Sequence, residues 1–162
     1  MAGDRNHYER AFTGWLNRRR LTAMGVDERA RPHVQGRRLK NFDFLVNGAG
    51  RVYALDLKGR RGTPWITRDD LFSLMAWRGL FKGAAEPALL FAFYAPGPKT
   101  PSRLRDLPGP EHREGSGMYR FCVLALEDAQ RLARPRSARW NTYGFEWKAF
   151  CKAARPADTL LG

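Results

Sequence analysis

The segment FDFLVNGAGRVYALDLKGR, residues 42–60, places acidic and basic side chains where apolar ones are expected. Both arms of this segment are mainly apolar and the NGAG between them is a typical turn sequence, so the pattern predicts a β-hairpin. Asp43 lies in the first arm, whereas Asp56 and Lys58 lie near the end of the second. Because side chains two residues apart share one face of a strand, Asp56 and Lys58 are expected to point the same way.

The hairpin is expected to bring the two aspartates together, because Asp43 lies across the turn from Asp56 if the arms pair through NGAG. Two unpaired carboxylates buried side by side would be destabilising. A divalent cation removes this repulsion, and two aspartates with a strand carbonyl suit Mg²⁺, which keeps waters in its remaining positions. Such a metal (Mg²⁺ or Mn²⁺) activates water and offsets the charge on a phosphate, and Lys58 could orient that water or stabilise the transition state.

These side chains have to be positioned by elements that alternate along the chain. Helical periodicity is expected in residues 7–20 and 67–81, where Thr67 and Asp70 are placed as a capping box. The strands are expected at residues 21–26, 42–46, 51–57, 88–95 and 118–126, the later helices at 127–133 and 146–154, and a short extended segment at 139–145. The order α-β-β-β-α-β, with a further αβ layer, predicts an α/β fold around a central mixed sheet, in one domain of residues 1–162.

Two segments stand out by composition. The apolar run at 88–95 is typical of a central buried strand. Residues 96–117 contain five prolines and four glycines. This second segment is therefore expected to be a long loop without structure of its own.

The charge of the chain favours a polyanionic partner. There are 29 basic and 16 acidic residues, a net charge of +13, and 23 of the basic residues are arginine. Arginine binds phosphates with two parallel hydrogen bonds and stacks on bases, which suits nucleic acid. The alternative is a basic soluble protein whose arginines serve no particular partner.

Several classes of protein are disfavoured. Three scattered histidines and two distant cysteines give no zinc-ligand spacing, and no P-loop, G-x-G-x-x-G or G-x-S-x-G sequence occurs. No apolar run has the length of a membrane helix, and the polar N-terminus gives no sign of a secretory signal. A reduced, cytoplasmic setting is therefore expected.

The arrangement of Asp43, Asp56 and Lys58 resembles the PD-(D/E)XK nuclease superfamily, which includes restriction endonucleases and archaeal Holliday-junction resolvases. The chain is also similar to a group of bacterial proteins of the HYExAF type. The matching segments are HYERAF (7–12), KNFDF (40–44), DLKGR (56–60), WITRDDL (65–71) and RSARWNT (136–142). Two departures from the commonest pattern are an aspartate, Asp56, in place of glutamate and the absence of a proline before Asp43.

The resemblance implies a restriction-endonuclease-like α-β-β-β-α-β core and a set of site residues. Asp43, Asp56 and Lys58 match the catalytic motif, and Glu9 matches the first-helix glutamate of resolvase-like members, which with the two aspartates would hold the metal. Glu9 could instead serve the helix dipole. Further candidates are His7 for phosphate contact or proton transfer, Arg60 and Arg61 as phosphate clamps, and Arg136, Arg139 and Trp140 for backbone contact and base stacking.

Each of these further candidates has a plainer alternative. His7 could simply pack against Tyr8, the arginine pair after the hairpin could be solvated, and Trp140 could be a core residue with arginines at its rim.

Three functions follow as hypotheses. The first is a Mg²⁺-dependent endodeoxyribonuclease acting on branched or structured DNA, possible as a homodimer because such folds often pair to cut two strands. The second is a catalytically inactive nucleic-acid-binding module that keeps the fold and the basic surface. The third, a protein-interaction scaffold, is disfavoured by the large positive charge.

Overall fold

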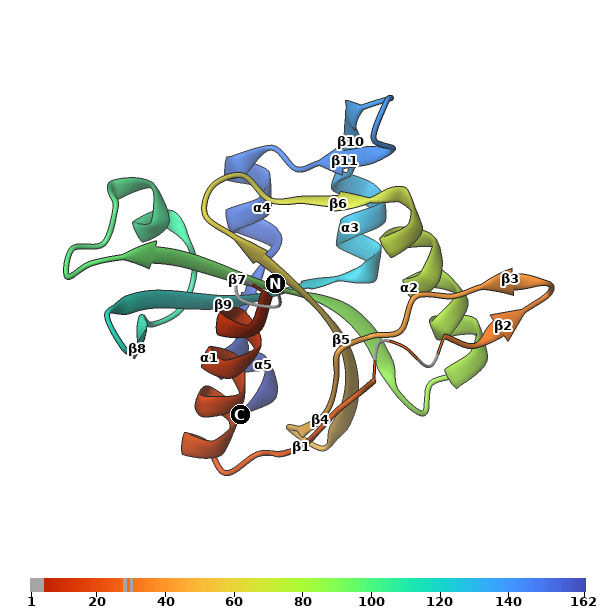
Figure 1. Ribbon diagram of the computed structural model, residues 1–162, viewed down its shortest axis with the longest axis horizontal. Coiled ribbons are helices and arrows are strands. Elements are labelled where there is room, and N and C mark those ends of the chain that lie inside the picture. Colours follow the sequence, from red (N-terminus) through yellow and green to blue (C-terminus); the bar gives the residue numbers. More distant parts are fainter. Residues whose placement is uncertain (1–4, 28, 30) are drawn as a thin grey trace.

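Within residues 5–27, 29 and 31–162, which the computed structural model describes, seven strands form a mixed β-sheet through the middle of the protein (Figure 1). Their bounds are β1 (Thr22–Gly25), β4 (Phe44–Gly48), β5 (Arg51–Arg60), β7 (Glu86–Pro96), β8 (His112–Glu114), β9 (Gly117–Ala125) and β12 (Arg155–Pro156). The order across the sheet is β1-β4-β5-β7-β9-β12, with β8 also paired to β9. Only β5 and β7 among these pairs are parallel.

Helices cover both faces of this sheet (Figure 1). They are α1 (Arg5–Arg18), α2 (Arg68–Phe81), α3 (Leu126–Leu132), α4 (Trp147–Ala153) and α5 (Ala157–Leu161). Phe12 of α1 and Leu161 of α5 belong to one buried apolar cluster. Leu74 of α2, Leu126 of α3 and Phe150 of α4 belong to a second cluster. The predicted α/β class with a central mixed sheet flanked by helices is therefore confirmed.

Strand β7 separates the two apolar clusters. Its alternate residues Leu90 and Ala92 pack on the α1 side, whereas Leu89, Phe91 and Phe93 pack on the α2 side. All five are fully buried. The prediction of a central buried strand at 88–95 is confirmed, because an apolar residue is needed at every position when both faces are covered.

Helix α2 connects the parallel strands β5 and β7. Its first turn is held by the predicted capping box, in which the Thr67 hydroxyl accepts the Asp70 N–H and the Asp70 carboxylate accepts the Thr67 N–H. This cap fixes where the helix begins relative to the end of β5.

The expectation for residues 96–117 is wrong. This segment contains the 3₁₀ helix η1 (Ser102–Asp106) and strand β8. Leu104 and Leu107 are buried in the cluster on the α2 side, and the Arg120 side chain donates to the Leu107 carbonyl oxygen at 2.9 Å. Two apolar anchors and an arginine thus order a segment whose prolines indicated only turns.

Several short elements escaped the sequence patterns. They are β2 (His33–Val34), β3 (Arg37–Arg38), β6 (Trp65–Thr67) and β10 (Arg134–Ser137), together with β12 and α5, whereas β11 (Thr142–Gly144) lies within the short extended segment expected at 139–145. β2 pairs with β3, and β6, β11 and β10 form a small antiparallel sheet. Strands of two to four residues are too short to show a periodicity, so only tertiary pairing defines them.

None of the helices in the described ranges is long and apolar enough to cross a membrane.

Candidate active site

The predicted hairpin is present, and it opens at one end. The β4–β5 ladder runs from the Gly48–Arg51 pair to the Phe44–Leu55 pair. One step further, the Asp43 N–H donates to the Leu55 carbonyl oxygen at 2.8 Å, and the Asp43 carboxylate accepts the Leu57 N–H at 2.6 Å. The Asp43 carboxylate therefore takes the place of the backbone carbonyl oxygen that would accept the Leu57 N–H if the ladder continued. The Leu57 carbonyl faces the same side as its own N–H, so backbone and carboxylate oxygens meet at this open edge of β5.

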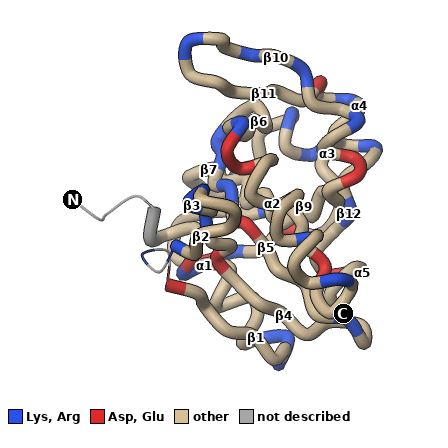
Figure 2. The backbone as a smooth tube through the Cα atoms, turned by 90° about the vertical axis from the view of Figure 1, so that its right-hand side faces the viewer, with Lys and Arg blue, Asp and Glu red and all other residues tan. Residues whose placement is uncertain are grey.

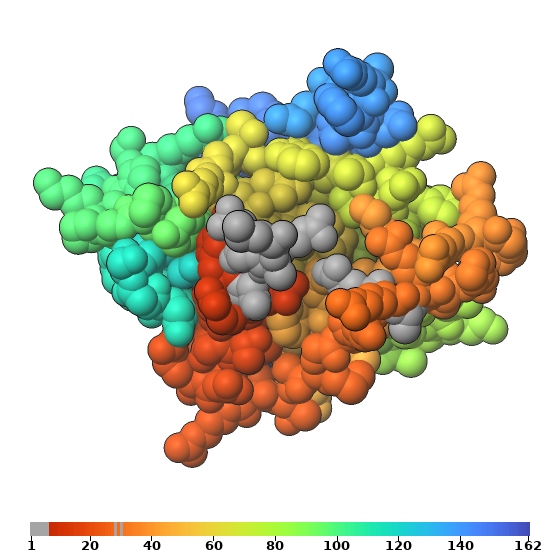
Figure 3. All heavy atoms as spheres, in the orientation of Figure 1, coloured from red at the N-terminus to blue at the C-terminus, as the bar shows by residue number. Residues whose placement is uncertain are grey.

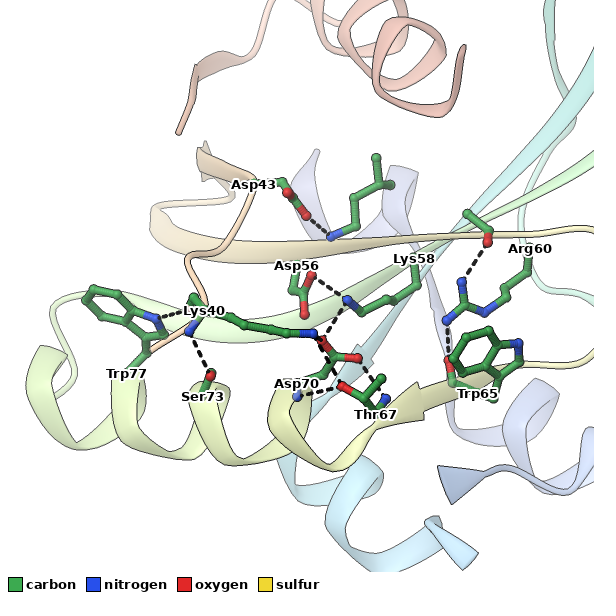
Figure 4. A network of polar contacts seen from close by, with 12 residues as sticks. Lys40, Asp43, Asp56, Lys58, Arg60, Trp65, Thr67, Asp70, Ser73 and Trp77 are labelled. Carbon is green, nitrogen blue, oxygen red and sulfur yellow. Dashed lines mark hydrogen bonds and ion pairs between the residues drawn. The ribbon is translucent and has the colours of Figure 1, made fainter. Parts of the chain in front are cut away.

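Asp56 and Lys58 follow on the face of β5 that is turned toward α2 (Figure 4). Leu57, between them, packs with the cluster on the α1 side, as strand alternation requires. Asp56 is 7% exposed. The Lys58 ammonium lies 3.0 Å from the Asp56 carboxylate and 3.0 Å from the Asp70 carboxylate. The charges of both signs in this strand therefore form a buried network.

The structure brings all four predicted motif residues to one cavity. The cavity has a volume of about 440 Å³, and its wall includes Glu9, Asp43, Asp56 and Lys58. Glu9 reaches it from α1, and the other three come from the hairpin. Among the described residues, however, no three His, Cys, Asp or Glu side chains are close enough together to hold one metal ion. Glu9 thus shares the cavity without joining the two aspartates as a ready ligand.

The donor set at the open edge nevertheless fits a hard divalent cation. Burial raises the pKa of Asp56; the Lys58 ammonium opposes this rise, the Asp70 carboxylate adds to it, and a hydrogen bond with Asp43 opposes it. Two carboxyl groups in hydrogen-bond contact, with the Leu57 carbonyl beside them, form a site that gains from a positive charge. Oxygen-only ligands of this kind match Mg²⁺ or Mn²⁺ and not zinc.

Asp70 and Lys40 belong to the site although the motif reasoning did not assign them to it. Asp70 is 2% exposed and accepts from the ammonium groups of both Lys40 and Lys58 at 3.0 Å. Burial alone would raise the pKa of Asp70, but Lys58, the Thr67 N–H and Lys40 outweigh it and hold this pKa well below its usual range. The capping box was the available signal: it marks the start of the helix that follows β5 and the short strand β6, and it shows that Asp70 lies in the first turn of that helix.

The two arginines at the end of the hairpin have different positions. Arg60 lines the cavity, lies over the Trp65 ring at 3.9 Å, and donates to the carbonyl oxygens of Gly59 and Trp65 at 2.7 and 2.5 Å. Burial lowers its pKa to about 10. Arg61 is exposed, and its guanidinium lies 5.2 Å from the Tyr94 ring. Arg60 is thus held against β6, whereas Arg61 faces solvent.

His7 does not line the cavity. Its ring packs against the Tyr8 ring at a tilt of 33° with centroids 3.9 Å apart, and its Nδ1 lies 2.8 Å from the Tyr119 hydroxyl. This is the plainer alternative of the two expected for His7, packing at the start of α1.

The C-terminal candidates lie at the small sheet. Arg136 of β10 lies 5.1 Å from the Trp65 ring, so it approaches the same tryptophan as Arg60. Trp140 is 67% exposed, with the Arg139 guanidinium 4.9 Å from its ring. The alternative of Trp140 as a core residue is therefore wrong. Trp140 lies in a turn, and the next residue, Asn141, has a φ of 48°.

Gly59 sets the distance between α1 and β5. A Cβ atom at this position would overlap the ring of Tyr8, the residue before Glu9. The missing side chain lets α1 approach the strand closely, and this approach brings Glu9 to the cavity wall.

The fold is similar to that of a solved structure. No family model matches the chain, and neither does any curated protein. The 1.6 Å structure of Hjc from Archaeoglobus fulgidus, a Holliday junction resolvase from an archaeal hyperthermophile, matches it with a TM-score of 0.56. The match covers 97% of this chain and 99% of that chain, at 13% sequence identity. The restriction-endonuclease-like fold implied by the sequence resemblance is thereby confirmed.

Proposed function

We propose that this protein is a metal-dependent endonuclease that hydrolyses DNA phosphodiester bonds, with branched or otherwise structured DNA as its substrate. The observation that carries the proposal is the cavity that Glu9, Asp43, Asp56 and Lys58 share at the open edge of β5. The choice of branched DNA is supported by the similarity in fold to a Holliday junction resolvase. The net charge of +13 suits a phosphate backbone.

The acidic and the basic residues of the cavity have different roles in this proposal. Asp43, Asp56 and the Leu57 carbonyl would hold Mg²⁺ or Mn²⁺, which when bound lowers the pKa of water and offsets phosphate charge. The Lys58 ammonium donates to the phosphate oxygens as negative charge develops on them. Burial lowers the pKa of Lys58, but Asp56 and Asp70 outweigh this and raise it above its usual value. Lys58 is therefore protonated at neutral pH, and Glu9 at the cavity wall would hold a water.

One observation favours a second function, a nucleic-acid-binding module without catalysis. Lys58 is shared between two carboxylates at 3.0 Å each. An ammonium held in this way neutralises buried acids and needs no phosphate partner. In this alternative the network only stabilises the fold, and the basic surface alone contacts DNA.

Cleavage assays separate the two functions. Purified protein is incubated with a four-way junction, nicked duplex, single strands and plain duplex of shared sequence, in Mg²⁺, Mn²⁺ or EDTA. The proposal expects cleavage of the junction or nicked DNA with either metal and none in EDTA. Binding of the same DNAs without cleavage in any metal would favour the non-catalytic module.

A matched pair of variants assigns any cleavage to this site. Lys58→Met keeps the length of the side chain and removes the charge, and is expected to lower the cleavage rate by about 10²–10³-fold. Lys99→Met removes the same charge from an exposed position outside the cavity and is expected to cleave like the wild type. Equal activity of both variants would mean that the cleavage arises elsewhere.

A further inference from the structure

A second groove adjoins the candidate active site. Its volume is about 650 Å³, which is within the range of clefts that hold small ligands. Arg31, Lys40 and Thr67 line both this groove and the active-site cavity, so a molecule in one would lie next to the other. In Figure 3 the segment of β2 and β3 (orange) stands beside the start of α2 (yellow-green), with the β10–β11 turn (blue) above them.

The wall of this groove is strongly basic. Arg37 and Arg38 come from β3, Arg68 from the first turn of α2, and Arg31 from the chain before β2. Asp69 is the acidic residue among those that line it. In Figure 2, Lys and Arg also recur along β10 above this region. The wall therefore complements a chain of phosphates in charge.

Two exposed aromatic rings lie in the same wall. Trp140 is 67% exposed and Phe72 is 40% exposed, and both line the groove. Each has an arginine near its ring, Arg139 at 4.9 Å from Trp140 and Arg37 at 5.1 Å from Phe72. Large aromatic rings next to arginines form the kind of surface on which unpaired bases stack while their phosphates are neutralised.

We propose that this groove binds an unpaired DNA strand that leaves the duplex beside the cleavage site, with a base stacked on Trp140 and phosphates on Arg37 and Arg38. The inference rests on the proposed function for the identity of the neighbouring site. An unpaired strand is favoured over a duplex for two reasons. Bases inside a duplex are already stacked on both faces, and a groove of about 650 Å³ holds nucleotides but not a double helix.

The test measures binding in EDTA, where no metal-dependent cleavage can occur. The probes are a fluorescently labelled blunt duplex and the same duplex with a thymidine tail, and fluorescence anisotropy gives each dissociation constant. The wild type is expected to bind the tailed duplex about tenfold more tightly, since stacking of one base contributes on this order. Quenching of Trp140 fluorescence, obtained as the difference between the wild type and Trp140→Phe, should accompany binding of the tail.

Two sets of variants, each with its own control, locate the effect. Trp140→Ala is expected to abolish the preference for the tail and Trp140→Tyr to keep most of it, while Met75→Ala, at an exposed position of α2 outside the groove, leaves it unchanged. The double variant Arg37→Ala/Arg38→Ala should weaken tail binding and reduce its salt dependence. Arg51→Ala, at the opposite end of β5, serves as the charge control. Thermal melting checks that every variant is folded.

The outcomes distinguish this inference from the proposed function. Equal affinity of the folded wild type for tailed and blunt duplex would overturn the inference, even if the protein cleaves junctions. Equal loss of both affinities in Trp140→Ala would also overturn it and assign the groove to duplex DNA. If the protein prefers the tailed duplex in a way that depends on Trp140 but cleaves no DNA, the inference about the groove is supported and the proposed nuclease activity is refuted.

Discussion

Strands β5 and β7 lie side by side in parallel, yet they carry opposite chemistry. Asp56, Lys58 and Arg60 of β5 are in register with Leu89, Phe91 and Phe93 of β7. β7 is paired on both sides, with β5 and β9, and each of these three β7 residues is fully buried. β5 loses its β4 partner after the Phe44–Leu55 pair. On the side of the sheet that faces α2, β5 thus carries a charged network, whereas the neighbouring strand β7 carries apolar, mostly aromatic core residues.

The difference shows how a stable sheet can hold buried charges. The open edge gives Asp56 and Lys58 access to the cavity. The pairing of β5 with β7 along the other edge holds the backbone that carries both residues in place. Side chains on a strand with one paired edge are positioned accurately because the backbone cannot shift. Charges placed on β7 would have neither the opening nor the ionic partners.

The largest expected effect is a change on the β5 side of the comparison. Asp56→Asn keeps the shape of the side chain but removes a negative ligand from the open edge. We expect cleavage to fall on the order of 10³-fold, since both metal affinity and charge placement are lost. DNA affinity in EDTA should stay the same or tighten, because a negative charge has left a site that faces phosphates. Gel-based cleavage rates across a Mg²⁺ titration, with binding measured separately, check this; wild-type cleavage would contradict it.

The matching change on β7 should affect stability and not chemistry. Leu90 is fully buried in the cluster on the α1 side, and Leu90→Ala is expected to lower the free energy of unfolding by about 2–5 kcal/mol. Urea denaturation measures this loss. The cleavage rate per folded molecule should remain near that of the wild type. A large drop in this rate would mean that the two strands are not separable into scaffold and site.

A smaller effect is expected from the carboxylate that links β5 to α2. Asp70→Asn keeps a cap for the helix but removes one of the two charges that hold Lys58, and cleavage is expected to fall roughly tenfold, as when other supporting residues of a site are lost. Because Asp70 raises the pKa of Lys58, the variant should lose activity at a lower pH on the alkaline side. A pH–rate profile measures the shift. Glu127→Gln, which removes an exposed charge from the first turn of α3, outside both the cavity and the groove, should show neither change.

The smallest effect concerns stability in acid. The folded state depresses the pKa of Asp70, so its contribution is complete above the unfolded pKa of about 3.9 and is lost as the pH falls below it. At pH 7, Asp70→Asn should therefore be less stable than the wild type by about 1–2 kcal/mol. This gap should narrow between about pH 4 and pH 2. Thermal unfolding of both proteins across this range tests the sign; a gap that widens in acid would contradict it.

The long elements could be predicted from the sequence because each has a local pattern of residue types that can be recognised without knowledge of the tertiary packing. The apolar run at 88–95, the hairpin with its NGAG turn and the capping box at Thr67 all have local signals. In the small sheet, β11 falls within the segment predicted as extended, but β10 is too short to show a periodicity, and β6 acquires its pairing with β11 only when distant segments meet. Residues 96–117 misled for the opposite reason, since prolines mark turns but do not show that Leu104 and Leu107 are anchored in the core.

For the candidate site, the sequence predicted which residues line the cavity but not which ion pairs they form. Asp43, Asp56 and Lys58 line one cavity, as the hairpin geometry led us to expect, and Glu9 lines it as the family resemblance implied. The sharing of Lys58 with Asp70, and the approach of Lys40, depend on how α2 lies against β5. Arg60 shows the same limit: its type indicated a phosphate contact, whereas its position against Trp65 follows from the place of β6.

Gly59 has no functional group, yet the absence of a side chain at this position determines how closely α1 can approach β5. Any larger residue there would overlap the Tyr8 ring, so the ring or the first helix that carries Tyr8 and Glu9 would have to shift. In a library of all single substitutions selected for cleavage, position 59 should thus be as intolerant as position 56. The glycine of DLKGR would then be retained for steric clearance, and a scan that seeks reactive side chains alone would overlook it.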